Sequence, residues 1–144
     1  MNTFKDDLAF GEKYQHELVK ILKPSKYIMS EGNFKYYDII MTIDYFDLYY
    51  EVKTCRIGYK TKNICIEYEC SGKKSGISST HADYYAYFIV KPDETYELYI
   101  INVDDIKEVV IKKSYIKIVN CGDNFKSKAY LFNKDIFEKY LFIF

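Results

Sequence analysis

Net charge, long apolar runs and paired cysteines are all missing from this 144-residue chain. Lys plus Arg and Asp plus Glu each total 21, and a formally neutral chain is not expected to coat nucleic acid through bulk charge. Arg56 is the single arginine, so bidentate recognition of guanine has almost no candidates and sequence-specific DNA recognition is not expected. No apolar run approaches the ~18 residues that span a bilayer, so we expect no membrane partner.

The first ten residues, MNTFKDDLAF, carry acidic side chains where a secretory signal would carry basic ones, which predicts a cytoplasmic protein that is not secreted. The cysteines form no C-x-x-C pair and have no histidine at zinc-ligand spacing. We therefore expect buried, reduced thiols and neither a disulfide framework nor a structural zinc at Cys55, Cys65, Cys70 and Cys121.

What the chain has in abundance is aromatic and β-branched segments in strand-like patterns, with 17 Tyr and 10 Phe. The patterns predict helices over residues 3–23, 78–83, 103–113 and 134–142, a basic loop over 56–62, and strands over 27–30, 34–43, 46–55, 63–69, 84–90, 96–101, 115–120 and 127–132. This order predicts an α/β (α+β) protein with a mixed central β-sheet flanked by helices. No repeat or linker interrupts it, so we expect one domain over residues 1–144.

The segment FKYYDIIMTIDYFDLYYEVKTC, residues 34–55, is predicted to be a β-hairpin that reverses between Asp44 and Tyr45. This register places Asp38 opposite Glu51, with Lys53 on the same face as Glu51. A one-residue bulge would move one carboxylate to the other face, and a solvated amphipathic hairpin is the alternative interpretation because E-x-K often occurs by chance.

Two carboxylates and a lysine on one face suit a hard cation. Mg²⁺ prefers oxygen ligands and binds through one or two carboxylates plus water and substrate phosphate. Asp38 and Glu51 are the predicted metal ligands, together with the backbone carbonyl of Val52. Lys53 would stabilise developing negative charge or help to deprotonate the attacking water. Glu67 and Glu69 are expected either to face the same side as Glu51 from a neighbouring strand, where one of them would help to organise the site, or to lie on a solvated strand edge.

The D-x(12)-E-x-K spacing of Asp38, Glu51 and Lys53 after an N-terminal helix resembles the PD-(D/E)XK nucleases, with Tyr37 in the place of the proline. The later segment GKKSGISSTHADYYAYFIV is similar to one in phage and viral members of that superfamily. The resemblance implies a restriction-endonuclease-like core over residues 8–92, with residues 93–144 completing the fold in a role that it does not assign.

Many members of the family carry a glutamate on the first helix that helps to build the metal site. Here the matching helix presents Gln15, with Glu12 and Glu17 close by. A phosphate-contacting role is predicted for basic and hydroxyl side chains around the second motif, namely Arg56, Lys73, Lys74, Ser78, Ser79 and Thr80. Asp83 is expected to have a structural role, in which its carboxylate accepts hydrogen bonds from backbone amides where its strand begins.

The function implied is a Mg²⁺-dependent endodeoxyribonuclease, with Mn²⁺ expected to substitute. The lack of base-reading arginines favours structure-selective cutting of branched DNA, as in Holliday-junction resolvases, although duplex DNA is an alternative substrate. Such enzymes usually act as homodimers. A restriction- or recombination-type nuclease or exonuclease on the same site is an alternative. So is a catalytically inactive nuclease fold that binds nucleic acid or protein.

Overall fold

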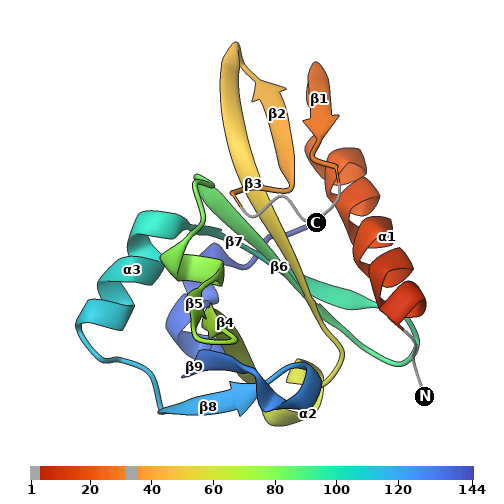
Figure 1. Cartoon of the computed structure of the whole chain (residues 1–144). Helices are drawn as coiled ribbons and strands as arrows, with labels where there is room; N and C mark the ends of the chain where they lie inside the picture. Colours follow the sequence, from red (N-terminus) through yellow and green to blue (C-terminus); the bar gives the residue numbers. More distant parts are fainter. Residues whose placement is uncertain (1–3, 32–35) are drawn as a thin grey trace.

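The computed structural model describes residues 4–31 and 36–144 and has a mixed α/β architecture (Figure 1). Its helices are α1 (Phe4–Leu22), α2 (Gly58–Thr61) and α3 (Val103–Ile111), with 3₁₀ segments η1 (Gly76–Ser78), η2 (Asp123–Phe125) and η3 (Lys134–Tyr140). Its strands are β1 (Lys26–Met29), β2 (Ile39–Ile43), β3 (Phe46–Cys55), β4 (Asn63–Cys70), β5 (Lys73–Lys74), β6 (Tyr84–Val90), β7 (Tyr96–Asn102), β8 (Lys117–Cys121) and β9 (Ser127–Asn133). Within the described part of the chain, no helix is both long and apolar enough to cross a membrane.

The central sheet has the order β1-β2-β3-β6-β7. β1, β2 and β3 form an antiparallel meander, and β3 then pairs in parallel with β6, which makes the sheet mixed as predicted. The β2–β3 hairpin has the predicted register, with Ile39 paired to Tyr50. Its turn residues Asp44 and Tyr45 have φ of 51° and 70°, the signs that a type I′ turn requires. The ladder therefore ends one residue before Asp38 and Glu51.

A second sheet, with the order β5-β4-β9-β8, was not predicted. Its strands β4 and β5 lie in the crossover between β3 and β6, and β8 and β9 join them from the part of the chain after β7. The sequence predicted the strands over 63–69, 115–120 and 127–132 but not a separate sheet. The predicted loop over 56–62 contains the short helix α2, and the predicted helix over 78–83 is replaced by the 3₁₀ turn η1. The last predicted helix is the 3₁₀ segment η3, whose first turn is capped by the Asn133 side chain.

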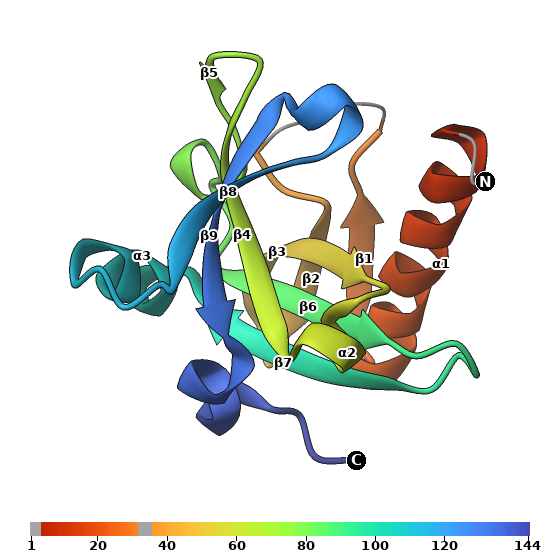
Figure 2. The ribbon, with the colours of Figure 1, turned by 90° about the horizontal axis from the view of Figure 1, so that it is seen from below.

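Helix α1 covers one face of the central sheet, and the second sheet lies on the other face together with α3 (Figure 2). Tyr14 and Leu18 of α1 are buried against Tyr50 and Phe88, whereas Leu8 of the same helix is 53 % exposed. α1 ends at Leu22, just before Pro24.

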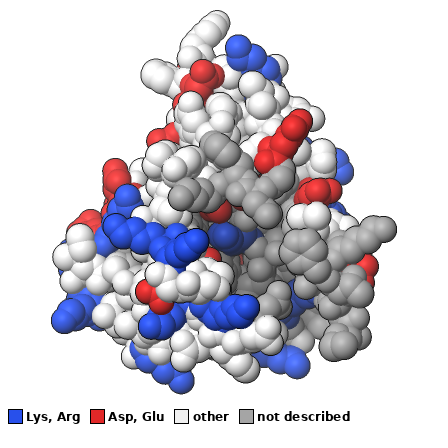
Figure 3. Space-filling view, viewed as in Figure 1, with Lys and Arg blue, Asp and Glu red and all other residues white. Residues whose placement is uncertain are grey.

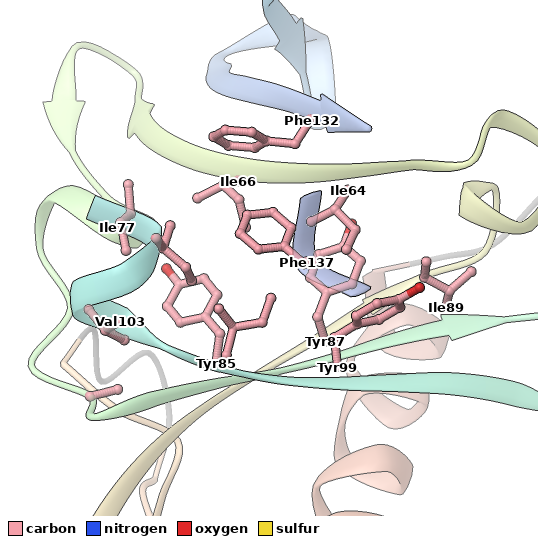
Figure 4. Packing of buried hydrophobic residues seen from close by; sticks show 13 residues of the cluster. Ile64, Ile66, Ile77, Tyr85, Tyr87, Ile89, Tyr99, Val103, Phe132 and Phe137 are labelled. Atoms are coloured by element: carbon pink, nitrogen blue, oxygen red, sulfur yellow. The ribbon is translucent and has the colours of Figure 1, made fainter. Parts of the chain in front are cut away.

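On the opposite face, isoleucines of β4 pack against aromatic side chains of β6 (Figure 4). Ile64 and Ile66 from β4 meet Tyr85 and Tyr87 from β6 in one buried cluster that also includes Phe132 of β9. Because side chains alternate along a strand, Glu51 and Lys53 share this face with Tyr85. The predicted site therefore faces the second sheet and not α1.

Candidate functional site

Asp38 lies immediately before β2 and is fixed to β3 through both its backbone and its side chain. Its N–H donates to the Tyr50 carbonyl at 2.9 Å, and its Oδ2 accepts from the Val52 N–H at 2.7 Å. Since Val52 directly follows Glu51, these bonds hold the Asp38 carboxylate beside β3 at the level of Glu51. The predicted proximity of the two acidic residues is therefore supported by hydrogen bonds that strand register alone did not specify.

Glu51 and Lys53 are neighbours on the same face of β3. The Lys53 Nζ lies 3.4 Å from Glu51 Oε1. Glu51 is 9 % exposed, and its Oε2 is buried without a hydrogen-bond partner among the described residues, whereas the Lys53 side chain is 38 % exposed. A buried carboxylate oxygen without a partner is costly to the fold. This orphaned oxygen marks Glu51 as a side chain that the described protein groups alone do not satisfy.

The electrostatics of this group of residues are dominated by burial and by an excess of acidic side chains. Burial raises the pKa of Glu51 to about 7; the Asp38 charge adds to this rise, while Lys53 opposes it. Burial also raises the pKa of Asp38, against the opposing effects of the Val52 N–H and Lys53. Burial would lower the pKa of Lys53, but the carboxylates of Glu51, Asp38 and Glu67 outweigh it and raise the pKa. Lys53 therefore remains a cation.

Glu67 approaches this group from the second sheet. β3 pairs only with β2 and β6 among the described strands, so the prediction that Glu67 and Glu69 lie on a strand next to β3 is wrong. Glu67 nevertheless lines a cavity of about 240 Å³ together with Lys53 and Tyr85, and its Oε2 accepts from Ser75 Oγ at 2.9 Å. The sheet crossing, rather than strand pairing, brings Glu67 to the site.

The structure does not bring the predicted first-helix residues to this group. α1 packs on the opposite face of the central sheet, and Glu17 accepts a hydrogen bond of 2.9 Å from the Tyr96 hydroxyl. Tyr96 pairs with Val90 at the end of β6, whereas Glu51 pairs with Tyr85 near its start. Glu12 is exposed and Gln15 is half-buried on the same helix.

The predicted phosphate-contacting residues fall into separate places. Lys73 and Lys74 are exposed on β5, which follows the Cys70 end of β4, whereas Arg56 precedes the Asn63 end of that strand. Seven residue steps of strand separate the two ends by about 23 Å. The Arg56 guanidinium lies 3.7 Å from the centre of the Phe10 ring, on the α1 side of the sheet. Arg56 and the two lysines therefore do not form one surface.

The T-x-A-D segment instead fixes the backbone around Asp38. The Thr80 hydroxyl is buried and donates to the Tyr36 carbonyl at 3.2 Å, and the His81 N–H donates to the same oxygen at 2.7 Å. Asp83 accepts from the Tyr49 N–H at 2.9 Å, which confirms its predicted structural role. Ser78 is exposed and Ser79 is half-buried in the turn that leads to this segment.

In the face shown in Figure 3, basic side chains gather mainly on the lower half and acidic ones mainly on the upper half. The site lies where side chains of β3 meet those of the second sheet. Asp38, Glu51 and Glu67 supply three acidic groups there and Lys53 one basic group. The local charge balance is therefore negative, although the whole chain is formally neutral.

A divalent cation fits this donor set. Carboxylate oxygens are the ligands that Mg²⁺ prefers, and the orphaned Glu51 oxygen beside Asp38 offers a buried acceptor. In the described part of the chain, no three acidic, histidine or cysteine side chains could hold an ion by themselves. An ion here would thus depend on two carboxylates, the predicted Val52 carbonyl, water and substrate oxygens, a combination typical of Mg²⁺.

No family model, curated protein or solved structure matches the chain. The site is therefore interpreted from its own geometry and from the motif resemblance. The sequence pointed to Asp38, Glu51 and Lys53 but not to Tyr85, whose hydroxyl is buried near them. Alternation in β6 puts Tyr85 on the face of Tyr87, but only the parallel pairing with β3 shows that this face is the one with Glu51.

Proposed function

We propose that the protein is a Mg²⁺-dependent nuclease of the PD-(D/E)XK type that hydrolyses phosphodiester bonds at Asp38, Glu51 and Lys53. The observation that carries the proposal is the buried Glu51 carboxylate, which has one oxygen near Lys53 and the other without a partner, beside a second fixed carboxylate. The order of elements, an N-terminal helix followed by a meander and a parallel crossover, supports a restriction-endonuclease-like core.

Each side chain has a distinct role in this proposal. Asp38, held in place by the Val52 N–H, and Glu51 would bind the cation. Mg²⁺ bound there would act as a Lewis acid toward a phosphate oxygen and lower the pKa of a bound water. Lys53 stays protonated and would stabilise negative charge that develops on the phosphate. The Lys53 side chain is partly exposed, so a substrate could contact it.

The proposed substrate is DNA recognised by its shape. Lys73 and Lys74 project from the exposed β5 hairpin and would contact backbone phosphates without reading bases. With a single arginine in the chain, base-specific contacts have little support, so branched DNA such as a four-way junction is the preferred substrate, cut by a homodimer.

The test is a cleavage assay with Mg²⁺ or Mn²⁺ on four-way, flapped, single-stranded and linear duplex DNA. Lys53→Ala should lower the rate by about 10²–10³-fold because it removes a single electrostatic contact to the transition state. Asp38→Asn should abolish cleavage while DNA binding persists. Asp47→Asn is the matched control, since this exposed carboxylate of the same hairpin lies outside the site and should leave cleavage unchanged.

The outcomes separate the alternatives. Cleavage that proceeds only from DNA ends would identify an exonuclease, and cleavage of linear duplex at fixed sequences would identify a restriction-type enzyme. A folded protein that binds DNA but cuts none of the four substrates with either ion would be an inactive nuclease fold. That last result would refute the enzymatic proposal.

A further inference from the structure

Tyr85 is the register partner of Glu51 in the parallel β3–β6 ladder, so the two side chains lie next to each other on one face. Tyr85 is 1 % exposed, and its hydroxyl has no hydrogen-bond partner among the described residues. In the described part of the chain, Glu51 Oε2 is the other buried side-chain oxygen without a hydrogen-bond partner. The two unsatisfied polar atoms thus belong to adjacent residues.

The Tyr85 side chain lines the cavity of about 240 Å³ that Lys53 and Glu67 also line. Its hydroxyl lies within the electrostatic influence of Glu51, Glu67 and Asp38. The neighbouring tyrosine on the same face, Tyr87, differs in one respect, because its hydroxyl accepts a hydrogen bond of 3.2 Å from the Cys65 N–H. On β6, the Tyr87 hydroxyl therefore takes part in a hydrogen bond within the fold, whereas the Tyr85 hydroxyl near the acidic side chains does not.

A buried hydroxyl next to carboxylates can donate to one oxygen and accept from another donor, and water is the usual partner in a polar cavity. A tyrosine hydroxyl, whose ordinary pKa is about 10, carries its proton at neutral pH and does not act as a base there. Its available chemistry is hydrogen bonding. Mg²⁺ keeps several of its waters when it binds to a protein, and these waters need acceptors and orientation.

We propose that Tyr85 is a positioning residue whose hydroxyl hydrogen-bonds to water that hydrates the divalent cation held by Asp38 and Glu51; this inference rests on the proposed function. In this proposal the Tyr85 hydroxyl reaches the ion only through water. Outer-shell groups of this kind change metal affinity or activity by about 10–100-fold when they are removed. Tyr85 would thereby orient a water of the cation's hydration shell next to Glu51.

The experiment compares wild type, Tyr85→Phe and Tyr87→Phe in two measurements: the Mn²⁺ dissociation constant by titration calorimetry, and the melting temperature of the metal-free protein. Tyr85→Phe should raise the dissociation constant at least about tenfold. Its metal-free melting temperature should be equal to or above that of wild type, because the change deletes a hydroxyl that the protein leaves unpaired. Tyr87→Phe should show the reverse, a lower melting temperature with unchanged Mn²⁺ affinity.

Mn²⁺ affinity of Tyr85→Phe equal to that of wild type would overturn this inference and leave the proposed function standing. A loss of affinity together with a lower metal-free melting temperature would also overturn it, because the hydroxyl would then stabilise the fold. A wild-type protein that binds no Mn²⁺ at millimolar concentration would overturn the cation site itself, and the proposed function with it.

Discussion

Glu51→Gln in the metal-free protein provides a test of the site that does not depend on activity. The wild-type carboxyl is buried, and its pKa is raised from 4.5 to about 7, chiefly by burial. Between these two pH values the folded protein keeps a proton on Glu51 that the unfolded chain has released. The unfolded state then binds fewer protons than the native state, so wild-type stability falls as pH rises through this window and levels off above about pH 7.

The size of the effect follows from the shift. One pKa unit corresponds to about 1.4 kcal/mol, so a rise from 4.5 to about 7 corresponds to about 3 kcal/mol of stability lost on ionisation at pH 8. Glutamine resembles the protonated carboxyl in shape and charge. Glu51→Gln should therefore match wild type near pH 4.5 and exceed it by about 3 kcal/mol at pH 8. This gain already includes the loss of the Lys53 contact, because that attraction lowers the Glu51 pKa.

Urea unfolding followed by far-ultraviolet circular dichroism, in EDTA from pH 4.5 to 8.5, measures both curves. Glu69→Gln is the matched control, since Glu69 forms a partly exposed ion pair with Lys128 at 3.4 Å and such pairs contribute less than about 1 kcal/mol. The reasoning fails if the difference between Glu51→Gln and wild type does not grow with pH. It fails as well if the variant is the less stable protein at pH 8, which would mean that the ionised carboxylate stabilises the fold.

Two further changes test the elements around the site. Gly76→Ala should lower the free energy of unfolding by more than Gly72→Ala. Both positions have positive φ, which costs on the order of 1–3 kcal/mol for a residue with a side chain, but at Gly76 the added Cβ would also clash with the Glu67 carbonyl oxygen. Equal losses in denaturant unfolding would contradict the predicted steric clash. The double change Lys73→Ala and Lys74→Ala should weaken DNA binding about equally for all sequences and reduce the slope of log affinity against log salt by up to about 2; an unchanged slope in fluorescence anisotropy would place the DNA elsewhere.

The hairpin at the centre of the site was predictable because its determinants are local. Alternation of apolar and polar residues set the faces, and the short reversal at Asp44 and Tyr45 set the register that the structure confirms. The distance in sequence between Asp38 and Glu51 is small enough for this arithmetic to work without knowledge of the rest of the chain.

The second sheet was not predictable in the same way. β4 is an ordinary alternating strand, and nothing in its own sequence distinguishes pairing with β9, more than fifty residues later, from pairing with β3. Long-range pairing depends on which apolar faces are left uncovered after the local elements have formed. For that reason the sequence placed Glu67 near Glu51, but on a strand paired with β3, and the structure contradicts that pairing.

The first-helix prediction failed for a different physical reason. The apolar stripe of α1 shows that the helix packs on a sheet, but a stripe does not say which of the two faces it covers. The structure puts Tyr14 and Leu18 against the face that carries Tyr50, and this choice places Glu12, Gln15 and Glu17 away from Glu51. The resemblance implied a contribution from the first helix. The structure instead places Glu67 near Lys53 and Tyr85, on the opposite face of the central sheet from α1.

A fold under no functional constraint would gain stability from removing the very groups that define this site. Glutamine in place of Glu51 and phenylalanine in place of Tyr85 would each eliminate a buried polar atom that the described protein groups do not pair. The two atoms belong to side chains that are paired across the neighbouring strands β3 and β6. Both side chains lie on the face of the central sheet that also carries the partly exposed Lys53. Unpaired polar groups scattered through a core would indicate imperfect packing. Here they are concentrated around one acidic group with a single ammonium, and the hydrated cation that we propose would supply positive charge to Glu51 and water to Tyr85 at once.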